Sequence, residues 1–115
     1  MWEGMDQRRF PRAKCRCVVR LSQGGASSNI SSVTENIGLG GVCALLERGL
    51  DIFSPVGVEL YLEEGKVPIR AQGTVVWVVR RRGRGPSFDT GIEFAQMQPE
   101  DKARLEAAIE KLSPK

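Results

Sequence analysis

Apolar and polar residues alternate along several short segments of the chain, which is the periodicity of half-buried β-strands. Between Cys15 and Leu21 every second residue is apolar, whereas Arg16 and Arg20 fall on the opposite face. This segment is therefore predicted to be the first strand. Further extended segments are expected at residues 29–34, 42–46, 56–62, 67–79 and 90–95.

Trp77 lies in the longest of these segments. Strict alternation places it on one face of the strand together with Ala71, Gly73, Val75 and Val79. We therefore interpret Trp77 as a structural residue that packs in the core, not as a ring that stacks on a ligand.

Turn signals separate the strands, and one helix ends the chain. A glycine-rich turn is expected at residues 35–41, Gly65 supplies a hairpin turn, and the sequence RRRGRGP at residues 80–86 reverses the chain again. Pro99 and the two acidic residues after it predict the start of a helix, which runs to Leu112 with apolar residues at helical spacing.

Short strands, frequent turns and one terminal helix predict a mainly β protein. We expect a small antiparallel β-barrel of about six strands with a C-terminal helix at residues 99–112. Residues 8–115 are assigned to this single domain, and residues 1–7 are expected to form a flexible N-terminal arm, because they show no periodicity.

Composition removes several classes of function. The chain has 115 residues and a net charge of +3, but it has no histidine, which is the commonest general base and a common metal ligand. Its three cysteines include a C-x-C pair that fits small buried residues better than a metal site. No leader peptide and no apolar run of membrane-spanning length is present. We expect a cytoplasmic protein without enzymatic activity, metal, cofactor or membrane insertion.

Three arginines, Arg8, Arg9 and Arg12, precede the first strand in the sequence QRRFPR. Such a cluster by itself is most often a solvated basic edge. The guanidinium group, however, donates two parallel hydrogen bonds to a phosphate and can stack on a flat base. Taken together with the glycine-rich turn ENIGLGG, the cluster predicts a phosphate-bearing ligand with a ring system.

Residues 7–112 resemble the PilZ domain, a small β-barrel receptor module for the bacterial second messenger cyclic di-GMP. One PilZ motif, R-x-x-x-R, is matched by Arg8 and Arg12. The other, [DN]-x-S-x-x-G, is matched by residues 36–41, from Asn36 to Gly41. Trp77 and the TGIEF and PEDKARLEAAI segments are softer matches.

The resemblance implies roles for these positions. Arg8 and Arg12 would bind the ligand phosphates and lie against guanine, with Arg9 beside them, and Asn36 would read a guanine edge. Gly41 would supply a backbone shape or a close approach that a side chain would block. Gly38 stands where the family has serine, so a hydroxyl that contacts the nucleotide is missing and weaker binding is expected.

The leading hypothesis is a receptor that binds cyclic di-GMP and signals to a partner protein when the ligand orders the N-terminal arm. The alternative is a degenerate PilZ adaptor that does not bind the nucleotide and acts by protein–protein contacts in motility, pilus or polysaccharide systems, and so in biofilm formation. A third reading is a nucleic-acid-binding barrel that uses the arginines of residues 80–84 and the Arg8 cluster. It is disfavoured because the chain has few aromatic residues for base stacking.

Overall fold

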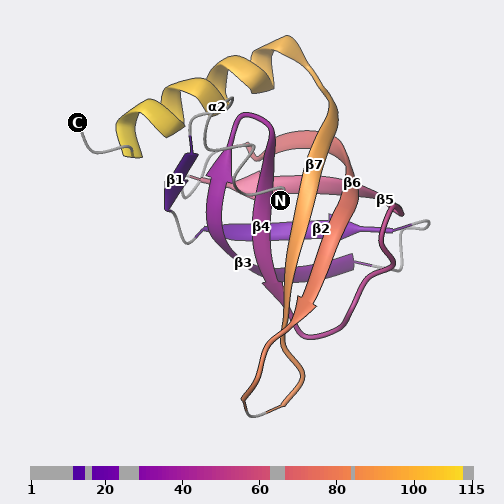
Figure 1. Ribbon diagram of the computed structural model, residues 1–115. Coiled ribbons are helices and arrows are strands. Elements are labelled where there is room, and N and C mark those ends of the chain that lie inside the picture. The colour runs from indigo at the N-terminus through magenta and orange to yellow at the C-terminus, as the bar shows by residue number, and fades with distance from the viewer. Residues whose placement is uncertain (1–11, 15–16, 24–28, 63–66, 84, 113–115) are drawn as a thin grey trace.

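The strands of the computed structural model form one closed sheet. The structure describes residues 12–14, 17–23, 29–62, 67–83 and 85–112. The elements are β1 (Arg12–Lys14), β2 (Val18–Ser22), β3 (Asn29–Gly38), β4 (Gly41–Leu46), β5 (Pro55–Tyr61), β6 (Ile69–Arg80), β7 (Phe88–Met97) and α2 (Pro99–Leu112). They pair in the order β1-β3-β2-β5-β6-β7-β4, and β3 also pairs with β4. This last pairing closes a six-strand antiparallel barrel (Figure 1), which confirms the predicted fold class.

The barrel interior is filled by the residues that alternate inward. In β2, Val19 and Leu21 are buried, whereas Val18 and Arg20 are exposed, as the alternation predicts. The same pattern buries the apolar residues of β5. Thr34 is buried with them, and its hydroxyl accepts a 3.1 Å hydrogen bond from the Cys17 backbone N–H. A buried hydroxyl that is paired in this way can be tolerated in an apolar core.

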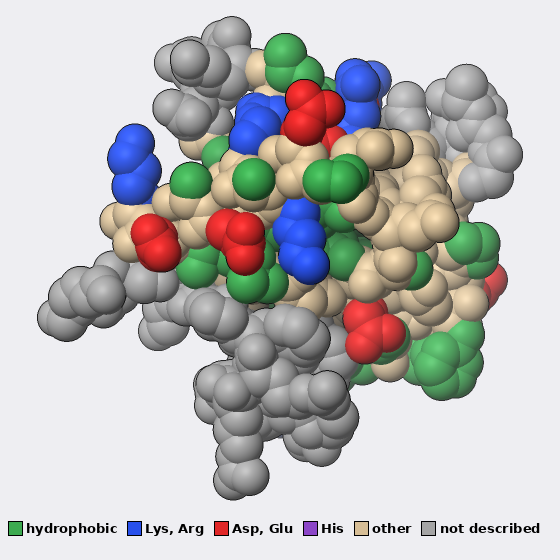
Figure 2. All heavy atoms as spheres, turned by 90° about the horizontal axis from the view of Figure 1, so that it is seen from above, with side chains coloured by type: hydrophobic (Ala, Val, Ile, Leu, Met, Phe, Trp, Pro, Cys, Tyr) green, Lys and Arg blue, Asp and Glu red, His purple; other side chains and the backbone are tan. Residues whose placement is uncertain are grey.

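Helix α2 covers one open end of the barrel (Figure 1). Leu105 and Ile109 are one turn apart on the helix, and both are buried in the barrel core. The Arg104 guanidinium pairs with Asp101 at 3.4 Å and donates to the Val67 carbonyl, which ties the helix to the chain ahead of β6. Basic and acidic side chains are interspersed over this end of the molecule (Figure 2). No helix in the described part of the chain has the length and apolarity to span a bilayer.

Strand β3 is longer than the sequence predicts. The turn expected at residues 35–41 is confined to Leu39 and Gly40, because the strand continues to Gly38. Pairing with β1 on one edge and β4 on the other extends this strand. A register shift between Thr34 and Asn36 leaves Glu35 as an extra residue, which is a β-bulge.

The prediction that Trp77 and Val79 share the core face of Val75 is wrong. The register of β6 against β7 shifts between Val75 and Trp77, so the alternation of inward and outward side chains is reversed beyond the shift. Val78 packs against the core, while 55% of Val79 is exposed. Trp77 therefore lies on the outer surface of the barrel.

A tight turn between β4 and β5 exposes two apolar residues, Ile52 and Phe53. The Ser54 backbone N–H donates to the Asp51 carbonyl at 3.2 Å, and the Phe53 N–H donates to the Val75 carbonyl at 2.6 Å. Phe53 has a φ of 70°, and 77% of the residue is exposed. Glycine or asparagine is the usual residue at a turn position with positive φ, so this backbone conformation is unfavourable for phenylalanine.

Replacing Phe53 by glycine should therefore stabilise the protein. Relief of the left-handed conformation outweighs the added flexibility of glycine, and we expect the free energy of unfolding to rise by about 0.5–1 kcal/mol in a urea titration. Ile52→Gly is the matched control, because Ile52 is also exposed but has no positive φ. Equal destabilisation by the two substitutions would contradict the prediction.

Candidate ligand-binding site

The short strand β1 brings the N-terminal arginine segment to the predicted turn. In its pairing with β3, Arg12 lies opposite Gly38, Ala13 opposite Ile37 and Lys14 opposite Asn36. For Arg12 the structure describes the backbone, and Arg8 and Arg9 lie outside the described residues, as does the predicted arm at residues 1–7. The backbone of Arg12 and the Asn36–Gly41 motif, 24 to 29 positions later in the chain, are thus neighbours in space.

The turn of this motif is fixed to the barrel on both sides. Leu39 packs against the core, and the Gly40 carbonyl accepts a 2.9 Å hydrogen bond from the Phe94 backbone N–H. Gly41 begins β4 and lies opposite Glu93 of β7. The structure therefore places Asn36, Gly38 and Gly41 around one rigid two-residue turn.

Asn36 belongs to a row of residues that crosses four strands of the barrel. Asn36 is opposite Cys43, Cys43 is opposite Gly91, and Gly91 is opposite Trp77. A Cβ atom at Gly91 would overlap the Trp77 indole, so the ring lies directly on the Gly91 backbone. Because residues of one row share a face of the sheet, the indole and Asn36 are presented on the same outer wall.

Alternation alone assigned Trp77 to the core, so the sequence did not reveal that it lies on the outer wall with Asn36. The β-bulge that moves it outside depends on the pairing of β6 with β7. The one sequence signal was Gly91, since a glycine inside a strand often marks a close approach of another group.

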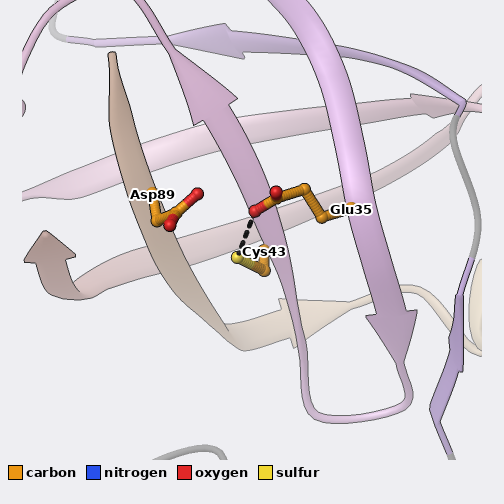
Figure 3. Close-up of side chains that lie close together, drawn as sticks. All are labelled: Glu35, Cys43 and Asp89. Atoms are coloured by element: carbon orange, nitrogen blue, oxygen red, sulfur yellow. Dashed lines mark hydrogen bonds between the residues drawn. The ribbon is translucent and has the colours of Figure 1, made fainter. Parts of the chain in front are cut away.

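Next to Asn36, two carboxylates and a thiol from three strands point toward one another (Figure 3). Ligand atoms of Glu35, Cys43 and Asp89 lie within 4.8 Å of one another. Carboxylate and thiolate groups are zinc ligands, so these residues could hold a metal ion. The Arg81 guanidinium, however, lies 3.3 Å from Glu35 Oε2 and 3.7 Å from Asp89 Oδ2. Arginine thus supplies positive charge to this cluster.

A second polar region lies on the opposite wall, formed by β2, β5 and β6. It is a hollow of about 400 Å³ whose lining includes Arg20, Glu59, Arg70 and Gln72. Glu59 is 3.0 Å from Arg70 and 4.0 Å from Arg20. The hydrogen bond from Arg70, helped by one from Tyr61, holds the pKa of Glu59 below its ordinary value, although burial opposes the shift. The arginines here already have a carboxylate partner, and none of the predicted site residues that the structure describes lies on this wall.

Comparison with known proteins agrees with this fold. The model of the PilZ domain family matches residues 6–111. No functionally curated protein matches the chain.

Several solved structures share the architecture. The PilZ domain of Escherichia coli YcgR, solved with cyclic di-GMP, is 16% identical with a TM-score of 0.72, over 92% of this chain and 91% of that one. The inhibitor of motility MotI from Bacillus subtilis is 18% identical with a TM-score of 0.72, over 91% of this chain and 50% of that one. The complex of MrkH from K. pneumonia with cyclic di-GMP is 17% identical with a TM-score of 0.72, over 91% of this chain and 52% of that one.

The chain therefore spans about half the length of MotI and MrkH and nearly all of the YcgR PilZ domain. The family model covers almost the whole sequence. The closed barrel with its C-terminal helix has the fold of PilZ domains. This chain belongs to the PilZ domain family.

Proposed function

We propose that this chain is a receptor domain for cyclic di-GMP that acts without catalysis in the bacterial cytoplasm. Arg8 and Arg12 bind the phosphates, Arg9 assists them, and Asn36 reads a guanine edge. Gly41 lets the nucleotide approach the turn closely, and Gly38 lies in the same motif without the serine hydroxyl of the family.

The observation that carries the proposal is the pairing of β1 with β3. Because the Arg12 backbone lies opposite Gly38, a side chain from the N-terminal segment needs to span only a short distance to a ligand on the Asn36 turn. A guanidinium donates charge-assisted hydrogen bonds to phosphate, which are roughly twice as strong as neutral ones. Two related proteins, YcgR and MrkH, have been solved with cyclic di-GMP, which supports the choice of ligand.

Trp77 extends the site along the outer wall. Its indole lies over Gly91 in the row that begins at Asn36, and it is partly exposed. A purine base bound at Asn36 can use the indole as a stacking surface. Aromatic side chains favour this contact for any base, because each base has a flat π face.

Binding is transmitted by the N-terminal segment. The ligand neutralises the arginines, and residues 1–12 then order against the barrel and form a new surface for a partner protein. MotI is described as an inhibitor of motility, which makes a component of the motility apparatus one candidate partner for this chain.

Isothermal titration with cyclic di-GMP tests the proposal directly. A hydrogen bond to a charged group contributes about 1.5–3 kcal/mol, so Arg8→Ala and Arg12→Ala should each raise the Kd by about 10- to 150-fold. Lys102→Ala removes the same charge from the exposed helix surface and should leave the Kd within about twofold of the wild-type value. No heat from the wild-type protein at high micromolar ligand would reject the receptor function.

The contact with Trp77 has its own spectroscopic test. In a Trp2→Phe background, Trp77 is the remaining tryptophan of the chain, and its fluorescence should change on saturation with cyclic di-GMP. Loss of a stacking partner costs about 1–3 kcal/mol, so Trp77→Leu should raise the Kd by roughly 5- to 150-fold. An unchanged emission spectrum at saturating ligand would place the nucleotide away from the indole.

The second candidate function is an adaptor that has kept the barrel and no longer binds the nucleotide. The observation that favours it is Gly38, which stands in the motif where the family has a serine hydroxyl. Such a protein would use its outer surface for protein contacts alone.

Gly38→Ser separates the two candidates. In a working receptor one added neutral hydrogen bond lowers the Kd by about 2- to 13-fold. If titration instead detects cyclic di-GMP binding in Gly38→Ser alone, the site of the natural protein has decayed and the adaptor function is supported. Gly40→Ser, which adds the same hydroxyl at the second residue of the turn, is the control and should not improve binding.

A further inference from the structure

We infer that Arg81 is a positioning residue for the nucleotide site. It holds Glu35, which shapes the strand at Asn36, and it thereby couples occupancy of the site to the hairpin between β6 and β7. This inference rests on the proposed function, because its ligand is cyclic di-GMP.

A β-bulge lies directly before Asn36 in β3. Thr34 is fully buried and joined to Cys17 by hydrogen bonds of side chain and backbone, so it is fixed from the core side. Asn36 is fixed in register opposite Cys43 and Lys14. Glu35 is the extra residue between them, and its conformation sets how the strand turns into Asn36.

Cys43 and Arg81 hold the Glu35 carboxylate in place. The Cys43 thiol donates to Glu35 Oε1 at 3.4 Å, and Arg81 Nη1 lies 3.3 Å from Glu35 Oε2 (Figure 3 shows the thiol and the carboxylates). Arg81 Nε is 3.7 Å from Asp89 Oδ2 of β7. One guanidinium thus bridges the bulged strand and β7, and the thiol belongs to the strand partner of Asn36.

The hairpin between β6 and β7 projects from the barrel (Figure 1), and Arg81 is the first residue after β6. Its backbone N–H donates to the Ser87 carbonyl at 2.8 Å, directly beyond the last strand pair, Arg80 with Phe88. A change in Glu35 on ligand binding therefore reaches both arms of this hairpin through one side chain. By thermodynamic linkage, the state of the hairpin must change ligand affinity by the same factor.

The contact between Arg81 and Glu35 is partly solvated, so we expect its loss to change the Kd only modestly. The side chains of Arg81 and Glu35 are 47% and 35% exposed, and ion pairs of this kind are individually weak. We expect Arg81→Gln and Glu35→Gln each to raise the Kd for cyclic di-GMP about 2- to 5-fold. The double variant should be no weaker than the worse single variant, because both substitutions break the same contact.

Titration calorimetry on the full chain measures these values, with Arg82→Gln as the matched control. Arg82 is the next residue and is exposed, and among the described residues it makes no ion pair. It should leave the Kd within about twofold of wild type, since it removes the same charge without touching Glu35. Thermal unfolding of Arg81→Gln close to the wild-type midpoint will show that the lost affinity is not a loss of fold.

Amide hydrogen exchange tests the coupling between the site and the hairpin. An ion pair with a purely structural role would not make this exchange depend on the ligand. Cyclic di-GMP should slow amide exchange in residues 81–88 of the wild type and of Arg82→Gln, and this protection should be absent in Arg81→Gln. Wild-type binding with an unchanged Kd and unchanged protection in Arg81→Gln would overturn the inference and leave the receptor function standing. Absence of binding by the wild type would overturn both.

Discussion

Hydrogen bonding along both edges of β3 is the constraint on which the rest of the structure depends. One edge pairs with β2 and then with β1, and the other pairs with β4, which closes the barrel. A closed sheet leaves no long unpaired edge, so its backbone groups are satisfied without water. The same pairing carries the N-terminal segment to the turn that follows β3. Closure of the fold and assembly of the candidate site therefore both depend on β3, through its pairing with β4 and with β1.

A barrel of this size has no room for a nucleotide inside. Small barrels are filled by their own side chains, and here the inward positions together with Leu105 and Ile109 of the helix form a continuous core. The proposed nucleotide binding therefore takes place on the outer wall, whose side chains do not fill the core. Two β-bulges decide which side chains reach that wall, since one adds Glu35 beside Asn36 and the other moves Trp77 outward.

Arginine has different roles at different places on this surface. Arg20 and Arg70 share Glu59 on one wall, and Arg81 bridges Glu35 and Asp89 on the other, so these guanidiniums are neutralised within the fold. A guanidinium that already has a carboxylate partner gives up part of its interaction when it binds another anion. Arg12, the arginine of the PilZ motif whose backbone the structure describes, is distinguished by its place in the fold, since it lies opposite Gly38 at the end of β3, next to the turn at Leu39 and Gly40.

The sequence by itself determined the strand content, the inward positions of β2 and β5, the terminal helix and the membership of the PilZ family, because these depend on local periodicity and on short motifs. It did not determine the length of β3 or the exposure of Trp77. The length of β3 depends on its pairing with β1 and β4, and the exposure of Trp77 depends on a one-residue register shift against β7, which reverses the face that a side chain occupies. The ion pair of Arg81 with Glu35 was equally hidden, since it joins residues 46 positions apart that only the tertiary structure brings together.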